Sequence, residues 1–185
     1  MERDAEATKR RLIAAGRAEF AAYGLNGARV DRIAASARSN KAQIYHYFGN
    51  KAGLFDAVWN ELVEQIVVNV PLDVNDLPGF TASLSDLYAE HPDIPRIITW
   101  QRLEHGDALN DLGIAEVRSR SAAIAELQAE GRISTRFDPR VLFALLAHVA
   151  MLWAASNPEV LAVLDPADRA QRRETIRRIA AALVE

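Results

Sequence analysis

The segment 30–51 holds the side chains whose types and spacing are best suited to chemistry. Within it, the pattern predicts a helix over 41–48 that begins with small and polar residues, namely Lys41, Ala42 and Gln43. Such residues let a helix approach the major groove of DNA closely, and they supply hydrogen-bond donors for base edges. The helix ends in an aromatic run, and a lysine follows it. These groups, Tyr45, His46, Tyr47 and Lys51, are suited to hydrogen bonds with the phosphate backbone, which do not read sequence.

Short helices with tight connections must position these side chains. Apolar residues at three- and four-residue spacing predict a helix over 30–37. Asn40 is a good N-cap for the helix over 41–48, and a longer amphipathic helix predicted over 4–23 ends at Gly24. Together the three helices form a compact unit of about 50 residues that contains a helix-turn-helix.

The helix-turn-helix resembles a known family. The stretch Lys-Ala-Gln-Ile-Tyr-His-Tyr-Phe-Gly-Asn-Lys at 41–51, with Leu54 and Phe55 soon after, is similar to the recognition helix and the start of the fourth helix of the TetR family of transcriptional regulators. Ile33 and Ala34 stand where the second helix of that family has the same pair. The remainder of the chain agrees with the family in length and helical character.

The resemblance implies roles for the residues that match the motif. Those that face the groove are Lys41, Ala42 and Gln43. Those near the phosphates are Tyr45, His46, Tyr47 and, at the fourth helix, Lys51. The core of the unit consists, by the same resemblance, of Ile33, Ala34, Ile44 and Phe48.

Three residues depart from the family pattern. Arg29 stands where the family usually has a threonine or serine N-cap, so this helix start lacks its usual side-chain acceptor, and we predict that Arg29 contacts a phosphate instead. Arg38 and Ser39 replace the usual glycine and apolar residue of the turn. This replacement predicts strain in the turn, which a DNA contact by Arg38 would offset.

Charge is divided unevenly along the chain. The net charge is −3, but residues 1–51 hold ten Lys or Arg and five Asp or Glu, a balance of +5, and the other residues carry −8. A basic N-terminal part therefore precedes an acidic remainder, and any contact with a polyanion is expected in the first 51 residues. Because the chain has no cysteine, disulfides, thiolate metal sites and cysteine nucleophiles are excluded.

The rest of the chain also has helical periodicity. Helices are predicted over 51–70, 80–90, 95–106, 113–130, 139–156 and 166–184, and no alternating stretch predicts a strand. We therefore expect an all-α chain with about nine helices. An N-terminal three-helix helix-turn-helix domain, 1–50, would bind DNA, and a C-terminal helical domain, 51–185, would bind an effector and dimerise.

The last two predicted helices favour a homodimer. The stretch 138–157 is apolar on nearly every side, so one of its faces needs a partner beyond its own core. The final helix carries Ile176, Ile179 and Leu183 on one side. Two copies of this pair would form an intersubunit four-helix bundle, which the resemblance also implies, and twofold symmetry predicts a palindromic operator. A core helix within one chain is the alternative interpretation.

Large apolar or amphipathic residues of the middle helices are candidates for an effector pocket, which the resemblance places there. They are Tyr88, Trp100, Leu103, Glu104, Phe143, His148 and Trp153, and the candidate polar anchors among them are Glu104 and His148. Filling a core explains each of them equally well. Because His91, His105 and His148 fall on different predicted helices or turns, we expect no metal site, and no cofactor is implied.

These features predict a ligand-responsive transcriptional repressor that binds its operator as a homodimer and that a small-molecule effector releases. No run approaches the roughly 18 apolar residues of a membrane span, and the first residues are too acidic for a signal peptide, so we expect a cytoplasmic protein. The alternatives are a small all-helical enzyme and a helical adaptor protein. The sequence shows no Gly-rich phosphate loop, metal cluster or activated nucleophile that would favour the enzyme.

Overall fold

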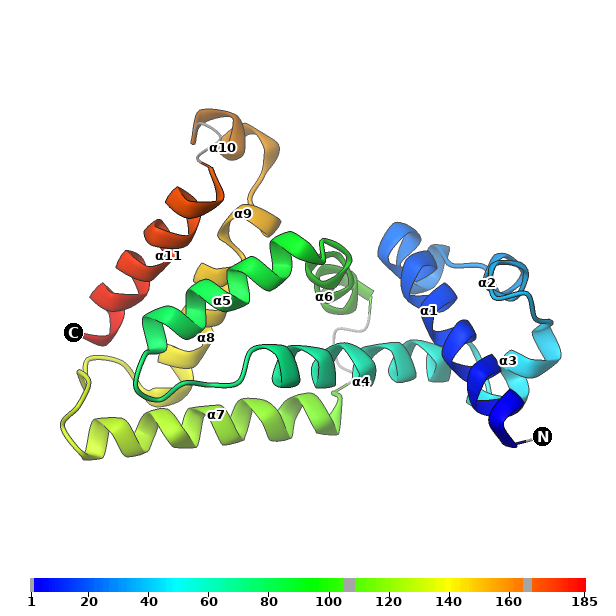
Figure 1. The fold of residues 1–185 in the computed structure, drawn as a ribbon, viewed down its shortest axis with the longest axis horizontal. Helices are drawn as coiled ribbons and strands as arrows, with labels where there is room; N and C mark the ends of the chain where they lie inside the picture. Colours follow the sequence, from blue (N-terminus) through cyan, green and yellow to red (C-terminus); the bar gives the residue numbers. More distant parts are fainter. Residues whose placement is uncertain (1, 105–108, 165–167) are drawn as a thin grey trace. The chain divides into compact units, whose positions relative to one another are not determined.

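The structure, a computed structural model, describes residues 2–104, 109–164 and 168–185, and its elements in these ranges are all helices (Figure 1). The helices of the first part of the chain are α1 (Glu2–Gly27), α2 (Val30–Ser36), α3 (Lys41–Phe48) and α4 (Lys51–Asn69). Those that follow are α5 (Leu77–Glu90), α6 (Asp93–Glu104), α7 (Asp111–Ala129), α8 (Pro139–Ala150), α9 (Leu152–Ala155), α10 (Pro158–Val163) and α11 (Arg169–Val184). The predicted all-α class is confirmed.

The predicted count of about nine helices is lower than the eleven that the described residues contain. The prediction of one helix over 139–156 is wrong, because the chain leaves α8 at Met151, whose backbone has φ −83° and ψ 1°. The segment α10 was not predicted, because six residues are too few for a clear period. The predicted helix end at 105–106 and the predicted start at 166–167 lie outside the described residues.

The chain forms two compact units. One consists of Met1–Glu64 with Asp93–Asn110, and the other of Gln65–Pro92 with Asp111–Glu185, so that α4 belongs to both. The predicted domains 1–50 and 51–185 were defined by their roles in DNA binding and effector binding. That division stays a prediction. Among the described residues, no helix is long and apolar enough to cross a membrane.

The N-terminal unit is organised around α1, which packs on α6 and on α2. Leu12 and Phe20 of α1 are fully buried with Leu54 of α4, and the ring of Phe20 meets that of Phe55 edge to face, with 5.1 Å between centroids. The predicted helix end at Gly24 coincides with a break in α1, since its φ of 68° and ψ of −178° lie outside the helical region, but α1 continues past this break and ends at Gly27. The helix-turn-helix is therefore packed against this core.

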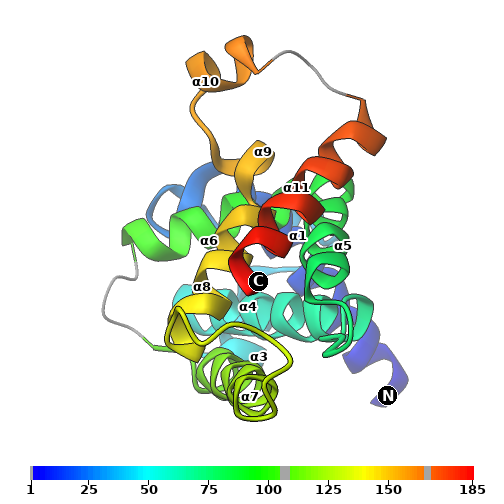
Figure 2. The same cartoon turned by 90° about the vertical axis from the view of Figure 1, so that its left-hand side faces the viewer.

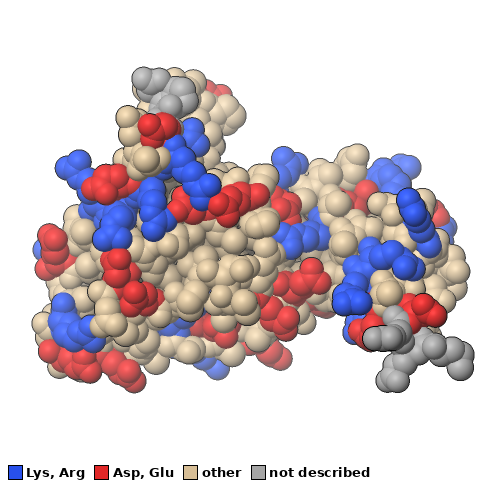
Figure 3. Space-filling model, viewed as in Figure 1, with Lys and Arg blue, Asp and Glu red and all other residues tan. Residues whose placement is uncertain are grey.

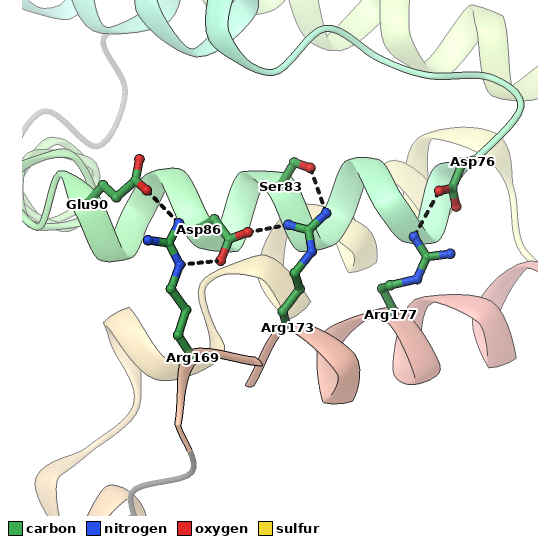
Figure 4. A network of polar contacts seen from close by, with 7 residues as sticks. All are labelled: Asp76, Ser83, Asp86, Glu90, Arg169, Arg173 and Arg177. Carbon is green, nitrogen blue, oxygen red and sulfur yellow. Dashed lines mark hydrogen bonds and ion pairs between the residues drawn. The ribbon is translucent and has the colours of Figure 1, made fainter. Parts of the chain in front are cut away.

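In the C-terminal unit α5 packs on α11 and α8, and α7 packs on α8 (Figure 2). Buried aliphatic side chains make the core, among them Leu84, Leu142, Leu146 and Ile176. A ladder of ion pairs adds to this contact between α5 and α11 (Figure 4). The arginines of α11 recur every fourth residue and therefore share one face of the helix. On the surface, acidic and basic side chains stand next to one another over these two helices (Figure 3).

The ladder joins each arginine to an acid of α5 or of its N-cap. Arg169 donates to Glu90 at 2.5 Å and to Asp86 at 3.3 Å, and Arg173 also pairs with Asp86. At the other end, Asp76 caps α5 by accepting from the Gly79 N–H at 2.8 Å, and it accepts from Arg177 at 2.8 Å. The hydrogen bond from Arg177, aided by that of Gly79, lowers the pKa of Asp76 from its ordinary value of 3.8.

The Asp76 pair predicts a specific loss of stability in acid. Because the pKa of Asp76 is lowered in the folded state, its contribution is present above pH 3.8 and is lost as the pH falls through the folded pKa. We expect the melting temperature to fall on acidification below about pH 4, and to fall less steeply in Asp76→Asn, which keeps an N-cap acceptor but loses the charge. Circular dichroism melts over a series of pH values measure both slopes.

The control for this prediction is Asp56→Asn, which removes an exposed carboxylate from α4. Its melting temperature should follow the wild-type pH dependence in the acid range, because its side chain is exposed and takes no part in the ladder between α5 and α11. If Asp76→Asn and wild type lose stability with the same slope, the Asp76–Arg177 pair does not carry the acid dependence.

Candidate nucleic-acid interface

The turn between α2 and α3 sets the position of the candidate recognition helix. Asn40 is the N-cap of α3, as predicted, and its side-chain oxygen accepts from the Gln43 N–H at 3.1 Å. Arg38 has a φ of 50°, the left-handed region that glycine prefers, and the Ser39 N–H returns to the Ala34 carbonyl at 2.9 Å. The turn thus keeps a geometry suited to glycine although an arginine occupies it, and this leaves the Arg38 side chain exposed.

The N-terminal end of α3 faces solvent. Lys41 and Ala42 are exposed and Gln43 is half-buried, while Ile44 is fully buried beneath them. Exposure also varies along the aromatic end of α3, where Tyr45 and His46 are exposed and Tyr47 is half-buried. Of the predicted core residues, Ile33, Ala34 and Ile44 are buried, and Phe48 is half-buried. The helix therefore presents its predicted groove-facing and phosphate-facing side chains on its outer surface.

A side chain of another helix, α1, accepts the backbone hydrogen bond at the start of α2. Arg29 is its N-cap residue and makes no side-chain capping hydrogen bond, as the departure from the family pattern predicted. Instead, Glu19 of α1 accepts from the Arg29 N–H at 2.9 Å and from Arg32 Nε at 2.7 Å. Burial alone favours the neutral form of Glu19, but the hydrogen bonds from Arg32 and Arg29 outweigh it and lower the pKa of this carboxyl. The Arg29 side chain stays exposed toward solvent.

Arg32 belongs to this arrangement, although it was not predicted from the sequence. Besides its bond to Glu19, its guanidinium carbon lies 4.3 Å from the centroid of the Tyr23 ring. Arg32 therefore joins α2 to α1 on the exposed side. The sequence offered only a weak signal for it, because an acid and an arginine 13 residues apart meet only after the chain has folded.

Two basic residues of the N-terminal unit, one of them the predicted phosphate ligand Lys51, also serve the fold. Lys51 Nζ donates to the carbonyl oxygens of Ala28 at 3.0 Å and Asn26 at 3.3 Å. Arg11 Nε donates to the carbonyl oxygen of Ala37, the C-cap residue of α2, at 3.2 Å. Both side chains donate to backbone carbonyl oxygens at or near the ends of α1 and α2. The predicted contact of Lys51 with a phosphate stays a prediction.

Lys41 pairs across the two helices of the motif. Its Nζ lies 2.6 Å from Asp31 Oδ1, and both side chains are more than half exposed. A solvent-exposed pair of this kind contributes little to stability, about 0 to 1 kcal/mol. A phosphate that approaches α3 therefore competes with Asp31 for the Lys41 ammonium at low energetic cost.

The candidate effector residues fall in both compact units. Three belong to α6 in the N-terminal unit, where Trp100 and Glu104 lie against Gly24 and Leu103 is 64% exposed. Glu104 Oε2 accepts from the backbone N–H groups of Leu25 at 2.5 Å and Asn26 at 3.0 Å. Trp100 and Glu104 thus both lie at the break in α1, where the carboxylate already has backbone donors.

The other four candidates belong to the C-terminal unit. Tyr88 and Phe143 are buried, and burial raises the pKa of Tyr88 to about 12. His148 is exposed and its Nδ1 lies 2.8 Å from the Ala144 carbonyl oxygen, while Trp153 is half-buried with its ring centroid 5.9 Å from the Arg172 guanidinium carbon. A cleft of about 380 Å³ in this unit is lined instead by residues of the ion-pair ladder, among them Asp86, Glu90 and Arg169.

The metal prediction involves one residue, His105, that lies outside the described residues. Among those that the structure does describe, no group of three or more His, Cys, Asp or Glu side chains is placed to hold a metal ion.

Two family models and several curated relatives match the chain. The model for bacterial regulatory proteins of the tetR family matches residues 12–58, which include α2 and α3, and the model for the tetracyclin repressor-like C-terminal domain matches residues 76–181. The HTH-type transcriptional repressor SCO4008 of Streptomyces coelicolor is 39% identical over 166 residues, which make up 88% of this chain and 85% of that protein.

Solved structures share the fold. The crystal structure of SCO4942 from Streptomyces coelicolor is 35% identical with a TM-score of 0.84, over 96% of this chain and 98% of that one. AibR, crystallised with isovaleryl coenzyme A and operator DNA, is 16% identical with a TM-score of 0.70, over 93% of this chain and 97% of that one, a likeness that concerns the fold alone. With its helix-turn-helix and its C-terminal helices both matched, this chain belongs to the TetR family of bacterial regulatory proteins.

Proposed function

We propose that this chain is a ligand-responsive transcriptional repressor, which binds a palindromic operator as a homodimer and is released by a small-molecule effector. The observation that carries the proposal is the exposed N-terminal end of α3, capped by Asn40 and held on a buried Ile44. The comparisons favour this function over the enzyme and the adaptor, since the relative SCO4008 is a repressor. In this proposal residues 1–50 read DNA, and residues 51–185 bind the effector and dimerise.

The proposed DNA contacts divide into base readers and phosphate ligands. Side chains at the start of α3 supply the base contacts, because they enter the groove first. The full set comprises Arg29, Arg38, Lys41, Ala42, Gln43, Tyr45, His46, Tyr47 and Lys51. Gln43 is the strongest candidate for a base-specific contact, since its amide offers a donor and an acceptor to the edge of one base.

Exposed apolar side chains on the last long helices support the homodimer. Val141 on α8 and Ile179 on α11 are 49% and 37% exposed, although α8 and α11 pack on each other and on α5. Ala144 and Ala182 are exposed on the same helices. Small and branched side chains of this kind allow close approach of helices, so a second copy of α8 and α11 would complete a four-helix bundle.

An effector acts in this proposal by preferring one of two conformations. It binds more tightly to the conformation in which the two recognition helices no longer match successive major grooves, and the difference in affinity sets how far it lowers operator binding. The candidate contacts in the C-terminal unit are Tyr88, Phe143, His148 and Trp153, and those in the N-terminal unit are Trp100, Leu103 and Glu104. AibR, a protein of the same fold, has been crystallised with both isovaleryl coenzyme A and operator DNA.

Selection from random duplex DNA tests the repressor directly. We expect a palindromic site to be enriched, and its affinity to fall with salt with a slope of about −0.9 per phosphate neutralised. Gln43→Ala should cost about 1 to 3 kcal/mol of discrimination at one base pair of each half-site while leaving the salt slope unchanged. Titrations of wild type and variant on the selected site and on its point variants measure both quantities.

The matched control is Gln171→Ala, which shortens an exposed glutamine of α11. Its affinity and selectivity for the operator should equal those of wild type. The proposal fails if no site is enriched over random DNA, and the assignment of Gln43 fails if both variants select the same sequence with the same stringency.

A further inference from the structure

Arg120 of α7 is a cation buried inside the C-terminal unit. It is 7% exposed, and its guanidinium carbon lies 5.3 Å from the centroid of the Phe80 ring. The acceptors that the described residues give it are distant: Nη2 lies 3.4 Å from the Val70 carbonyl oxygen, and Nε lies 3.8 Å from a carboxylate oxygen of Glu116. Charge-assisted hydrogen bonds of arginine are shorter, about 2.7 to 2.9 Å, so this guanidinium is only partly neutralised.

Such a residue is costly for a fold to keep. Removing a charge from water carries a penalty that only a close partner with good geometry repays. Burial accordingly lowers the pKa of Arg120, and Glu116 opposes this change only in part. An arginine nevertheless keeps its charge at any physiological pH, and it presents a planar fork of donors. The position therefore combines a permanent charge with unused capacity for hydrogen bonds.

The side chains around Arg120 indicate what kind of ligand its guanidinium would bind. Tyr88 of α5 is buried close enough that the Arg120 charge acts on its phenol, and burial keeps that hydroxyl protonated at neutral pH. Phe80 adds an aromatic face. One cation, one neutral phenol and one aromatic ring match a ligand with a single negative charge on a hydrocarbon body. A doubly charged phosphate would need a second cation, and Arg169, Arg173 and Arg177 of α11 are paired with acids.

We propose that Arg120 anchors the effector and that the effector is a monocarboxylic acid, with its carboxylate on the guanidinium fork and its hydrocarbon body against Phe80 and Tyr88. The inference deepens the proposed function and rests on it for the effect on DNA. Glu116, one turn before Arg120 on α7, is the internal carboxylate that the ligand displaces. Nothing in the sequence marked Arg120, because an arginine on a predicted helix is by default a surface residue.

Thermal shift with a homologous series of ligands tests the proposal. The probes are the straight-chain carboxylates from acetate to decanoate, each compared with its primary amide. We expect an optimum chain length at which the carboxylate, at about a hundredfold its dissociation constant, raises the melting temperature by about 5 to 10 °C, and the amide does so much less. The inference is overturned if no member of the series shifts the melting temperature, or if acids and amides act alike.

Two variants separate an effector anchor from a purely structural arginine. Arg120→Met keeps the length and apolar stem, and it should weaken carboxylate binding by about 10- to 100-fold without affecting the amides. Glu116→Gln removes the internal competitor and should tighten carboxylate binding relative to wild type. If Arg120→Met does not fold, Arg120→Lys takes its place, with weaker carboxylate binding expected from the lost fork. An intramolecular role alone predicts unchanged ligand affinity in every variant, which would also overturn the proposal.

Operator binding distinguishes this inference from the proposed function. Wild type and Arg120→Met should bind the selected operator alike without ligand, and the optimum carboxylate should release only wild type. Operator binding without any response of either protein to carboxylates would overturn the effector class and leave the DNA-binding function standing. Carboxylate binding without a selectable operator would support Arg120 as a ligand anchor and contradict the proposed DNA-binding function.

Discussion

Gly53→Ala is expected to destabilise the protein and to weaken its binding to DNA. Gly53 lies in the first turn of α4, where a Cβ would overlap the carbonyl oxygen of Phe48, well inside the 3.0 Å limit that real Cβ atoms keep. The obstacle is backbone and cannot rotate away. Relieving it requires the end of the recognition helix α3 to move, which we expect to cost about 3 kcal/mol and to lower the melting temperature by roughly 6 to 12 °C.

Helix propensity predicts the opposite sign for the same change, which makes the experiment decisive. An alanine inside a helix is favoured over glycine by about 1 kcal/mol when nothing touches it. Urea unfolding and operator titration of Gly53→Ala would therefore contradict the packing argument if stability rose. The matched control is Gly49→Ala at the same junction, where φ is 75° and a Cβ meets open space. It should cost only the strain of the left-handed backbone, about 1 to 2 kcal/mol.

The elements that carry local signals were predictable from the sequence. The bounds of α3 agree with the prediction over 41–48, because Asn40 and Gly49 are strong start and stop signals that act within a few residues. Gly24 likewise marks the break in α1. For the same reason the family motif was recognisable, since the buried and exposed positions of a short helix-turn-helix repeat at fixed spacing.

Features that depend on distant residues could not be predicted in the same way. The ladder between α5 and α11 joins residues 79 to 101 positions apart, and either helix alone only shows a charged face. Glu104 looked like a candidate polar anchor, and only the fold shows its bonds to the end of α1. Arg120 was passed over because burial is a tertiary property. The break at Met151 has no glycine or proline beside it to mark it.

Gly24 and Glu104 should prove energetically coupled, with large effects from either change. At Gly24 the φ of 68° and ψ of −178° are open to glycine almost alone, and a Cβ would stand 2.7 Å from a Glu104 oxygen and 2.8 Å from Trp100. We expect Gly24→Ala to cost about 3 kcal/mol, from backbone strain together with overpacking. Glu104→Ala strands the N–H groups of Leu25 and Asn26, at a cost of about 1 to 3 kcal/mol.

The double variant Gly24→Ala with Glu104→Ala separates the backbone strain at position 24 from the clash with the Glu104 carboxylate. Once Glu104→Ala has removed the carboxylate, an alanine at position 24 loses its clash with those oxygens, so the two losses should sum to about 0.5 to 3 kcal/mol more than the double variant shows in urea unfolding. Gly131→Ala, with φ 69° and open space around the added Cβ, gives the cost of placing an alanine at a positive φ without a clash. Strictly additive losses would mean that the clash with the Glu104 carboxylate contributes nothing to the cost of Gly24→Ala. If Gly24→Ala costs no more in the Glu104→Ala background than Gly131→Ala costs in wild type, the excess belongs to the clash with Glu104, because both alanines then stand at a positive φ without that carboxylate beside them.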